Sequence, residues 1–168
     1  MSEKMAEEFR LEFERVWTQT ADNVLAYMYC KCGRWADACD LLQNCYLRAF
    51  QGWENFDGRG TRNAWIFGIA RKTCADWFRT KKRQDAVISL ADMDEFNKAV
   101  CKNPNADEIE VIWSVVKGLD AEQREVIQLR FAAGLGYAEI AQTLDVPIGT
   151  VRSRLHRGLK EVREKIGE

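Results

Sequence analysis

The strongest constraint on the fold of this chain is the segment from residue 137 to residue 160. Its first part, YAEIAQTL, carries apolar residues at helical spacing, with the small Ala141 where a second helix must cross closely. Asp145 follows, and aspartate tolerates the left-handed backbone that a tight turn needs. Pro147 cannot continue the first helix but suits the opening of another. The segment therefore predicts a helix-turn-helix.

The second helix of this pair separates apolar from polar residues. Its apolar stripe, predicted to face the core, consists of Val151, Leu155, Leu159, Val162 and Ile166. The other side carries the residues predicted to meet DNA, which are Thr150, Arg152, Ser153, His156 and Arg157. Arginine bonds guanine through two hydrogen bonds in the major groove, and serine serves any base. The alternative is a solvated amphipathic helix, but the turn and both helices agree, which favours DNA binding.

Charge is distributed unevenly along a chain whose formal net charge is only −1. Residues 71–83 contain six lysines or arginines and one acid, and residues 152–165 contain six against two. Between them, residues 85–110 contain seven acids against two lysines. Two basic patches separated by an acidic stretch predict two contacts with one polyanion and a connector that avoids it.

The chain is predicted to be all-α. It has two prolines, and no run alternates between apolar and polar with a period of two. Apolar spacing predicts helices over residues 7–30, 37–50, 62–79, 109–117 and 120–132, besides the helix-turn-helix. Thr61 and Asp120 are the expected N-caps of two of these helices. Residues 56–61 form a predicted loop, because two glycines interrupt the pattern there.

The helices group into two small helical domains joined by a flexible linker. We expect the first domain over residues 1–84, the linker over 85–107 and the second domain over 108–168. The linker is acidic and loses strong periodicity, although residues 90–100 have the pattern of a short helix. Most tryptophans are predicted to pack: Trp35, Trp53, Trp65 and Trp77, together with Phe78.

No apolar run is long enough to span a bilayer, and the start of the chain lacks the apolar core of a signal peptide. We therefore expect a cytoplasmic protein with reduced thiols. Cys30, Cys32, Cys39 and Cys45 fall within sixteen residues, but their spacing differs from the paired C-x-x-C of zinc knuckles. No metal and no cofactor are predicted, while a zinc or redox role of these four cysteines stays open as an alternative.

Two blocks of motifs together resemble an extracytoplasmic-function (ECF) sigma factor of the sigma-70 family. DACDLLQ at residues 37–43, FDGRG at 56–60 and WIFGIAR at 65–71 resemble sigma region 2. LDAEQREV at residues 119–126 and the helix-turn-helix after it resemble sigma region 4. The resemblance covers about residues 21–166, and two blocks in the right order are far more specific than one helix-turn-helix.

The resemblance implies a non-enzymatic subunit of bacterial RNA polymerase. Region 2 of the family binds core polymerase and melts the −10 promoter element, and region 4 recognises the −35 element. By motif position, the implied core-binding residues are Asp40, Leu41, Gln43 and Asn44. The implied −10 residues are Phe56, Arg59, Arg71, Lys72 and Arg79, with Phe56 and the glycine loop forming a pocket for a flipped base. Lys72 stands where the family commonly has asparagine and offers only hydrogen-bond donors.

The implied partners are core RNA polymerase, promoter DNA and an anti-sigma factor, without direct membrane insertion. Two other functions remain open from the residues alone. A stand-alone helix-turn-helix regulator would bind duplex DNA by itself, usually as a dimer on repeated half-sites. A cysteine-based zinc or redox sensor would hold metal in stoichiometric amount.

Overall fold

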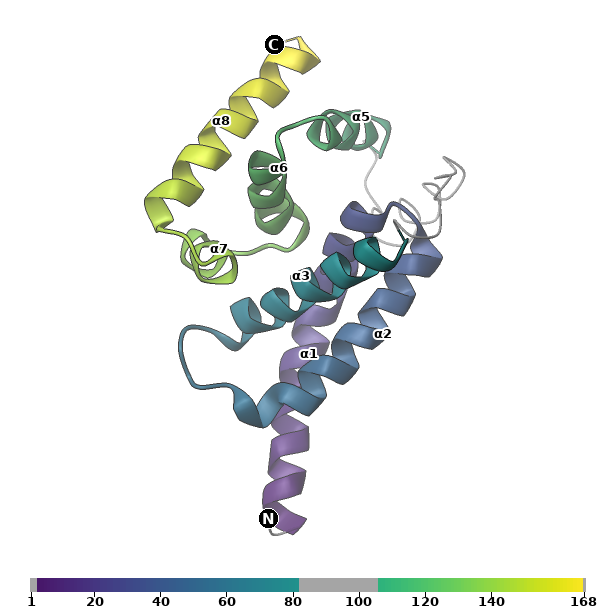
Figure 1. Cartoon of the computed structure of the whole chain (residues 1–168), viewed down its shortest axis with the longest axis vertical. Coiled ribbons are helices and arrows are strands. Elements are labelled where there is room, and N and C mark those ends of the chain that lie inside the picture. Colours follow the sequence, from purple (N-terminus) through teal and green to yellow (C-terminus); the bar gives the residue numbers. More distant parts are fainter. Residues whose placement is uncertain (1–2, 82–105, 168) are drawn as a thin grey trace. The chain divides into compact units, whose positions relative to one another are not determined.

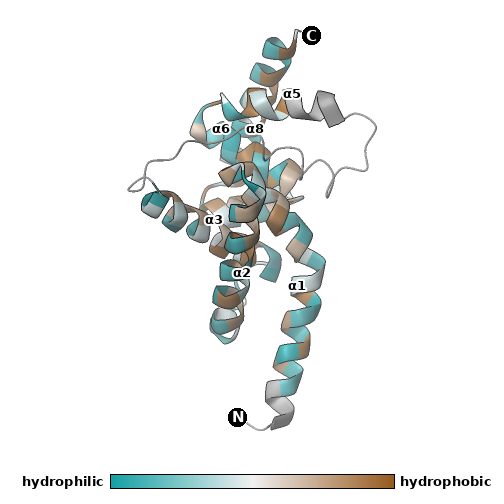
Figure 2. Ribbon diagram, turned by 90° about the vertical axis from the view of Figure 1, so that its right-hand side faces the viewer, coloured by the Kyte–Doolittle hydropathy of each residue, from teal (hydrophilic) through white to brown (hydrophobic). Residues whose placement is uncertain are grey.

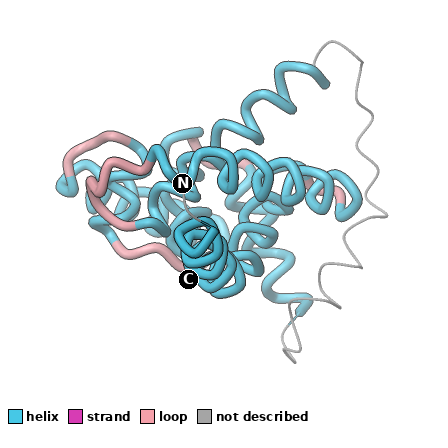
Figure 3. Tube along the Cα trace, turned by 90° about the horizontal axis from the view of Figure 1, so that it is seen from below, coloured by secondary structure: helices cyan, strands magenta, loops and turns pink. Residues whose placement is uncertain are grey.

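The computed structural model describes residues 3–81 and 106–167, with side chains for 7–81 and 111–167. The chain divides into two compact units, here called unit 1 (Met1–Ile88) and unit 2 (Ser89–Glu168). Over the described residues the structure contains helices and loops but no strand, as the tube in Figure 3 shows. The predicted all-α fold with two helical units is confirmed. The short helix expected within residues 90–100 lies outside the described residues.

The described part of unit 1, residues 3–81, contains three long helices and one short 3₁₀ turn. In chain order they are α1 (Glu3–Cys32), α2 (Trp35–Gly52), η1 (Trp53–Asn55) and α3 (Arg62–Lys81). Gly33, at φ +72°, ends α1 and lets the chain reverse into α2. All three long helices pack on one another, and the first turns of α1 extend past the others (Figure 1).

Aromatic rings fill the core of unit 1. Phe13 is fully buried, and its ring centroid lies 5.1 Å from that of Trp53, 5.2 Å from Phe50 and 5.3 Å from Tyr46. All three contacts are edge-on, the geometry that the quadrupoles of aromatic rings favour. Figure 2 shows how hydrophobic and hydrophilic residues interleave along these helices. The core of unit 1 is thus built around one central phenylalanine.

Unit 2 contains α5 (Ala106–Lys117), α6 (Ala121–Ile127), the π-helical turn η3 (Gln128–Ala132), α7 (Tyr137–Leu144) and α8 (Ile148–Ile166). Asp120 caps α6 as predicted, because its carboxylate accepts the N–H of Glu122 at 3.0 Å. The helix predicted to reach Ala132 does so, but its end is π-helical, with the Ala133 N–H bonded to the Gln128 carbonyl at 3.0 Å.

The core of unit 2 is aliphatic. Its buried residues include Val116, Leu119, Val126, Leu129, Leu135, Ile140, Val151 and Leu155. Gly158 on α8 faces α6, and a Cβ atom there would lie 2.9 Å from Cδ1 of Ile127. The absence of a side chain at this position therefore allows α8 to lie close against α6.

Two predictions about packing are wrong. Ile166 belongs to the apolar stripe of α8 by spacing, yet it is 41 % exposed in the last turn of that helix. Phe78 was expected in the core and is 44 % exposed, resting edge-on against Trp77 near the end of α3. In both cases the periodicity continues to the last turns of the helix, where less of the unit remains to cover the side chain. Trp53 is buried as predicted, and Trp35, Trp65 and Trp77 are partly buried.

Candidate functional site

The turn between α7 and α8 has the predicted geometry. Asp145 adopts the left-handed conformation at φ 54° and ψ 50°, the only non-glycine residue with positive φ in the part of the chain that the structure describes. The next N–H, of Val146, bonds the Ala141 carbonyl at 3.0 Å and closes α7. Pro147 then starts α8, and its carbonyl accepts the N–H of Thr150 at 2.9 Å. The helix-turn-helix is confirmed.

The predicted DNA-contacting side of α8 lies at the surface of unit 2. Val151 and Leu155 are buried, whereas Arg152, Ser153, His156 and Arg157 are exposed, and Thr150 is half-buried at the start of the helix. The Ser153 hydroxyl donates to the Thr150 carbonyl at 3.2 Å, and Nε of Arg157 donates to the Ser153 carbonyl at 3.4 Å. Both contacts are local and exposed, so they are easily exchanged for contacts to a ligand.

Arg154 lies between two of these residues and behaves differently. Its guanidinium pairs with the carboxylate of Glu122 on α6 at 2.6 Å, and its side chain is only 16 % exposed. The pair joins α8 to α6 and, together with the close contact at Gly158, fixes the helix in its unit. Among the arginines at the start of α8, Arg154 therefore supports the surface instead of belonging to it.

The outward face of α2 presents three of the four predicted core-binding residues. Asp40, Gln43 and Asn44 are exposed, whereas Leu41 is 2 % exposed and packs in the core of unit 1. The placement of Leu41 corrects the expectation, since its side chain does not reach the surface. Leu41 lies about 100° around the helix from Asp40, on the side that faces the core together with Ala38 and Cys45.

A groove of about 410 Å³ opens beside this face. Its lining consists of Trp17, Leu42, Gln43, Tyr46 and Leu47. Leu47 is 53 % exposed, and the Tyr46 hydroxyl donates to the carboxylate of Glu14 at 2.8 Å. The α2 surface thus combines an apolar groove with an adjacent acidic and amide-bearing row, a composition typical of surfaces that bind another protein.

The loop before α3 is ordered by its own contacts. Gly58 and Gly60 both have φ +77°, and Thr61 caps α3 as predicted by accepting the N–H of Ala64 at 3.0 Å. Arg59 is 90 % exposed and pairs with Asp57 at 3.2 Å. Phe56, expected to offer its ring to a base, is half-buried instead of open, since other side chains of unit 1 pack on it.

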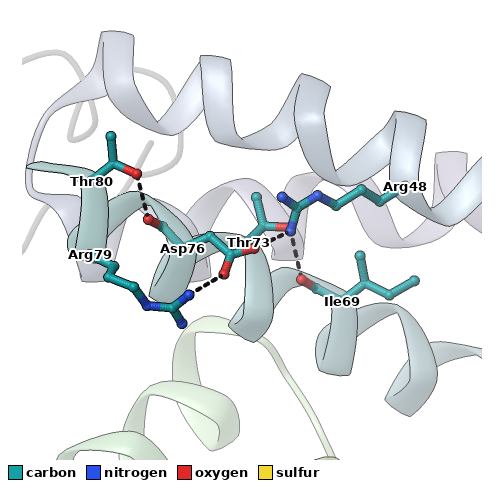
Figure 4. Close-up of polar contacts among 6 residues, drawn as sticks. All are labelled: Arg48, Ile69, Thr73, Asp76, Arg79 and Thr80. Atoms are coloured by element: carbon teal, nitrogen blue, oxygen red, sulfur yellow. Dashed lines mark hydrogen bonds and ion pairs between the residues drawn. The ribbon is translucent and has the colours of Figure 1, made fainter.

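Three predicted cations follow on α3. Lys72 and Arg79 are exposed, and Arg71 is half-buried. Figure 4 shows a carboxylate beside one of them: Asp76 pairs with Arg79 at 3.5 Å and with Arg48 of α2 at 2.8 Å. The hydrogen bond from Arg48 and the charges around it lower the pKa of Asp76 from its ordinary 3.8. Sequence reasoning missed Arg48, which brings a further cation from α2 to this surface.

The described cysteines lie in unit 1 and are not joined in disulfides. Burial raises the pKa of Cys45 to about 12, with the nearby Cys74 as a second cause. Burial also raises the pKa of Cys32, whose thiol donates to the Arg34 carbonyl at 3.3 Å. Among the side chains of residues 7–81 and 111–167, no three His, Cys, Asp or Glu converge on a point where a metal ion would bind.

A bilayer-spanning segment is likewise not found among the helices that the structure describes, since none of them is both long and apolar enough.

Family models match both units. Residues 16–84 match Sigma-70 region 2, and residues 109–162 match Sigma-70, region 4. The chain is 30 % identical over 157 residues to ECF RNA polymerase sigma factor SigE of Mycolicibacterium smegmatis, a match that covers 89 % of this chain and 60 % of that protein. It is 31 % identical over 132 residues to ECF RNA polymerase sigma factor SigX of Bacillus subtilis, covering 74 % and 68 %.

The chain therefore spans less than two thirds of the SigE relative's length but more than two thirds of SigX. Among solved structures, the fold is similar to the sigma factor RpoE from Bartonella quintana, crystallised in complex with the anti-sigma factor NepR. The TM-score is 0.73 at 22 % identity, and the match covers 94 % of this chain and 99 % of the other.

Proposed function

The chain belongs to the ECF RNA polymerase sigma factors, and we propose that it acts as a promoter-specificity subunit of RNA polymerase without catalytic activity of its own. The observation that carries this proposal is the surface of α8. In a helix-turn-helix of the predicted geometry, the buried stripe and the Arg154–Glu122 pair leave Arg152, Ser153 and His156 together at the surface. A helix held in this way presents a fixed set of donors to the major groove.

Unit 2 is the proposed reader of the −35 element. Arg152 and Arg157 supply guanidinium groups for guanine or phosphate, while Ser153 and Thr150 supply hydroxyls. His156 is exposed between them. The proposed second domain, residues 108–168, is supported by the region 4 match over residues 109–162.

Unit 1 is the proposed site of core binding and of −10 melting. Asp40, Gln43 and Asn44 form the proposed polymerase contact on α2, and Leu41 supports them from the core below. The −10 contacts are assigned to the loop and α3, through Phe56, Arg59, Arg71, Lys72 and Arg79. Their cations hold the backbone of an exposed strand electrostatically. The region 2 match over residues 16–84 supports a first domain of 1–84, with 85–107 as the linker.

The proposed regulation and cellular location follow from the same family membership. The RpoE structure from Bartonella quintana contains an anti-sigma factor, and we propose that a protein of that class also holds this chain inactive. A subunit of RNA polymerase works where the polymerase does, so the proposed location is the cytoplasm. A stand-alone regulator is not favoured, because the first unit also matches a sigma region and not a sensor.

Specific transcription from a randomised promoter library with core polymerase tests the proposal. Arg152→Ala should weaken recognition at one −35 position by about 1–3 kcal/mol and leave affinity for core unchanged. Asp40→Ala should do the reverse, lowering affinity for core while the −35 preference stays the same. Arg163→Ala at the far end of α8 and Asp22→Ala on α1 are matched controls on exposed residues. An identical defect in the Arg152 and Asp40 variants would contradict the division of labour.

A further inference from the structure

Arg62, the first residue of α3, lies over two aromatic rings of unit 1. Its guanidinium carbon is 3.9 Å from the ring centroid of Trp53 and 4.5 Å from that of Phe56. Nη1 donates a hydrogen bond to the Trp53 carbonyl at 2.9 Å, and Nη2 pairs with the carboxylate of Glu12 on α1 at 3.8 Å. Four contacts from three elements therefore fix the plane of this side chain.

This placement changes what the −10 surface offers to a base. Trp53 is 1 % exposed, and the Phe56 ring is engaged by Arg62 over its face and by Trp65 edge-on, at a centroid distance of 5.9 Å. The face of Phe56 that Arg62 covers is therefore open to a base only if Arg62 moves away from it. The Arg62 side chain, however, remains 28 % exposed, so part of it reaches the surface of this cluster.

We propose that the guanidinium of Arg62, and not the ring of Phe56, is the platform on which an unpaired base of the opened promoter strand stacks. A guanidinium is planar, delocalised and weakly hydrated, and unstacked bases pack on such planes as they do on aromatic rings. Because its contacts already hold the plane in place, little side-chain entropy remains to be lost when a base arrives. This inference rests on the proposed role of unit 1 in −10 melting.

The loop that precedes Arg62 leaves room for this approach. A Cβ atom added at Gly58 would meet no atom within 4 Å. Arg59 turns back onto Asp57, whose carboxylate also accepts the Arg59 N–H at 3.0 Å, so this exposed side chain is tied to its own loop. The loop therefore leaves open space at Gly58 for an approaching nucleotide.

Binding of the full chain, assembled with core polymerase, to fork-junction promoter DNA tests the proposal. Single-stranded −10 positions of the probe are made abasic one at a time. For the unsubstituted protein, loss of the stacked base should weaken binding about 5- to 100-fold at one position. In Arg62→Met the same abasic change should cost less than about twofold, since the platform is gone. Arg62→Lys keeps the charge but not the plane, and should match Arg62→Met in abasic sensitivity.

Arg15→Met removes an exposed arginine from α1 and should keep the full abasic penalty. Circular dichroism and affinity for core check that each variant is folded, and Arg62→Lys supplies the test if Arg62→Met is not. An undiminished penalty in both Arg62 variants would overturn the proposal. The proposal would also be overturned if Arg62→Met bound the probe more tightly and only Phe56→Leu abolished the abasic penalty. The base would then stack on the phenylalanine. If the unsubstituted chain fails to bind core, the proposed function itself falls.

Discussion

The cores of the two units consist of different types of side chain. Unit 1 packs rings around Phe13, and the outer members of that aromatic cluster, such as Phe56 and Trp65, are only partly buried. Unit 2 packs branched aliphatic side chains, and Gly158 lets two helices approach closely. Flat rings leave surfaces on which other flat groups can stack, whereas a tight aliphatic core sets the position of one helix. The contrast fits a unit that handles unpaired bases and a unit that presents α8 to a groove.

The largest expected effect comes from removing the central ring of unit 1. Phe13→Ala should lower the free energy of unfolding of unit 1 by about 3–5 kcal/mol, because the cavity cannot be refilled by neighbouring rigid rings. Hydrogen exchange resolved along the chain should show lost protection in α1, α2 and α3 with α6 and α8 unchanged. Phe13→Leu, which keeps most of the volume, is the control. Equal loss of protection in both units would mean that they do not unfold separately.

A smaller loss is expected from overfilling the close contact in unit 2. Gly158→Leu should destabilise unit 2 by about 1–3 kcal/mol, because the new side chain must displace Ile127 and Gln123.

Gly68, within α3, has no atom near its would-be Cβ. Gly68→Ala should therefore stabilise unit 1 by about 0.5–1 kcal/mol through helix propensity, while Gly158→Ala should not stabilise unit 2. Thermal unfolding measures both, and equal gains would refute a close approach at Gly158.

Alkaline pH should reveal a further difference in stability between the two units. The pKa of Cys45 is raised from 9.0 to about 12, so the folded state keeps a neutral thiol while the unfolded chain ionises. This contribution is complete below pH 9 and is lost as the pH rises toward 12. By pH 10 unit 1 should lose about 1–2 kcal/mol from this thiol. Chemical denaturation at pH 8 and 10 checks it, and Cys45→Ala should reduce the difference by the contribution of this thiol.

The smallest effect concerns the exposed charges of Figure 4. Because the pKa of Asp76 is lowered, its ion pairs stabilise unit 1 above the ordinary value of 3.8 and are lost as the pH falls through the lowered pKa. Carboxyl NMR titration should place Asp76 below that value. In Arg48→Met, which removes the main cause, the pKa should return toward it. An unchanged titration would show that Arg48 does not govern this carboxylate.

Local rules predicted much of the fold. The turn at Asp145, the caps at Thr61 and Asp120 and the order of the helices depend on neighbours in the sequence, so the residues themselves contain the signal. Ile166 and Phe78 were misplaced because periodicity defines a side of a helix but not the point where its partners end. Gly158 gave no signal at all, since its importance depends on Ile127 lying opposite.

Some features of the candidate site could likewise be predicted from local sequence, and others could not. The exposure of Arg152, Ser153, His156 and Arg157 on α8 follows from helical spacing, whereas Thr150 at the edge of this set is half-buried. Leu41 was carried over by motif position together with its exposed neighbours, and only packing revealed that it is buried. Arg48 and Arg62 act through partners 28 and 9 residues away, contacts that no local pattern contains. Long-range pairs of this kind require the folded arrangement.

The π-helical turn η3 has a consequence for how unit 2 tolerates changes in length. A π turn is equivalent to an α-helix into which one extra residue has been inserted. Deleting a single residue within Gln128–Ala132 should therefore leave a regular, uninterrupted helix, whereas the same deletion in α8 would rotate everything beyond it by about 100°. The segment after α6 can therefore lose one residue without disturbing the helix. Length variation among natural homologues of this unit should concentrate there.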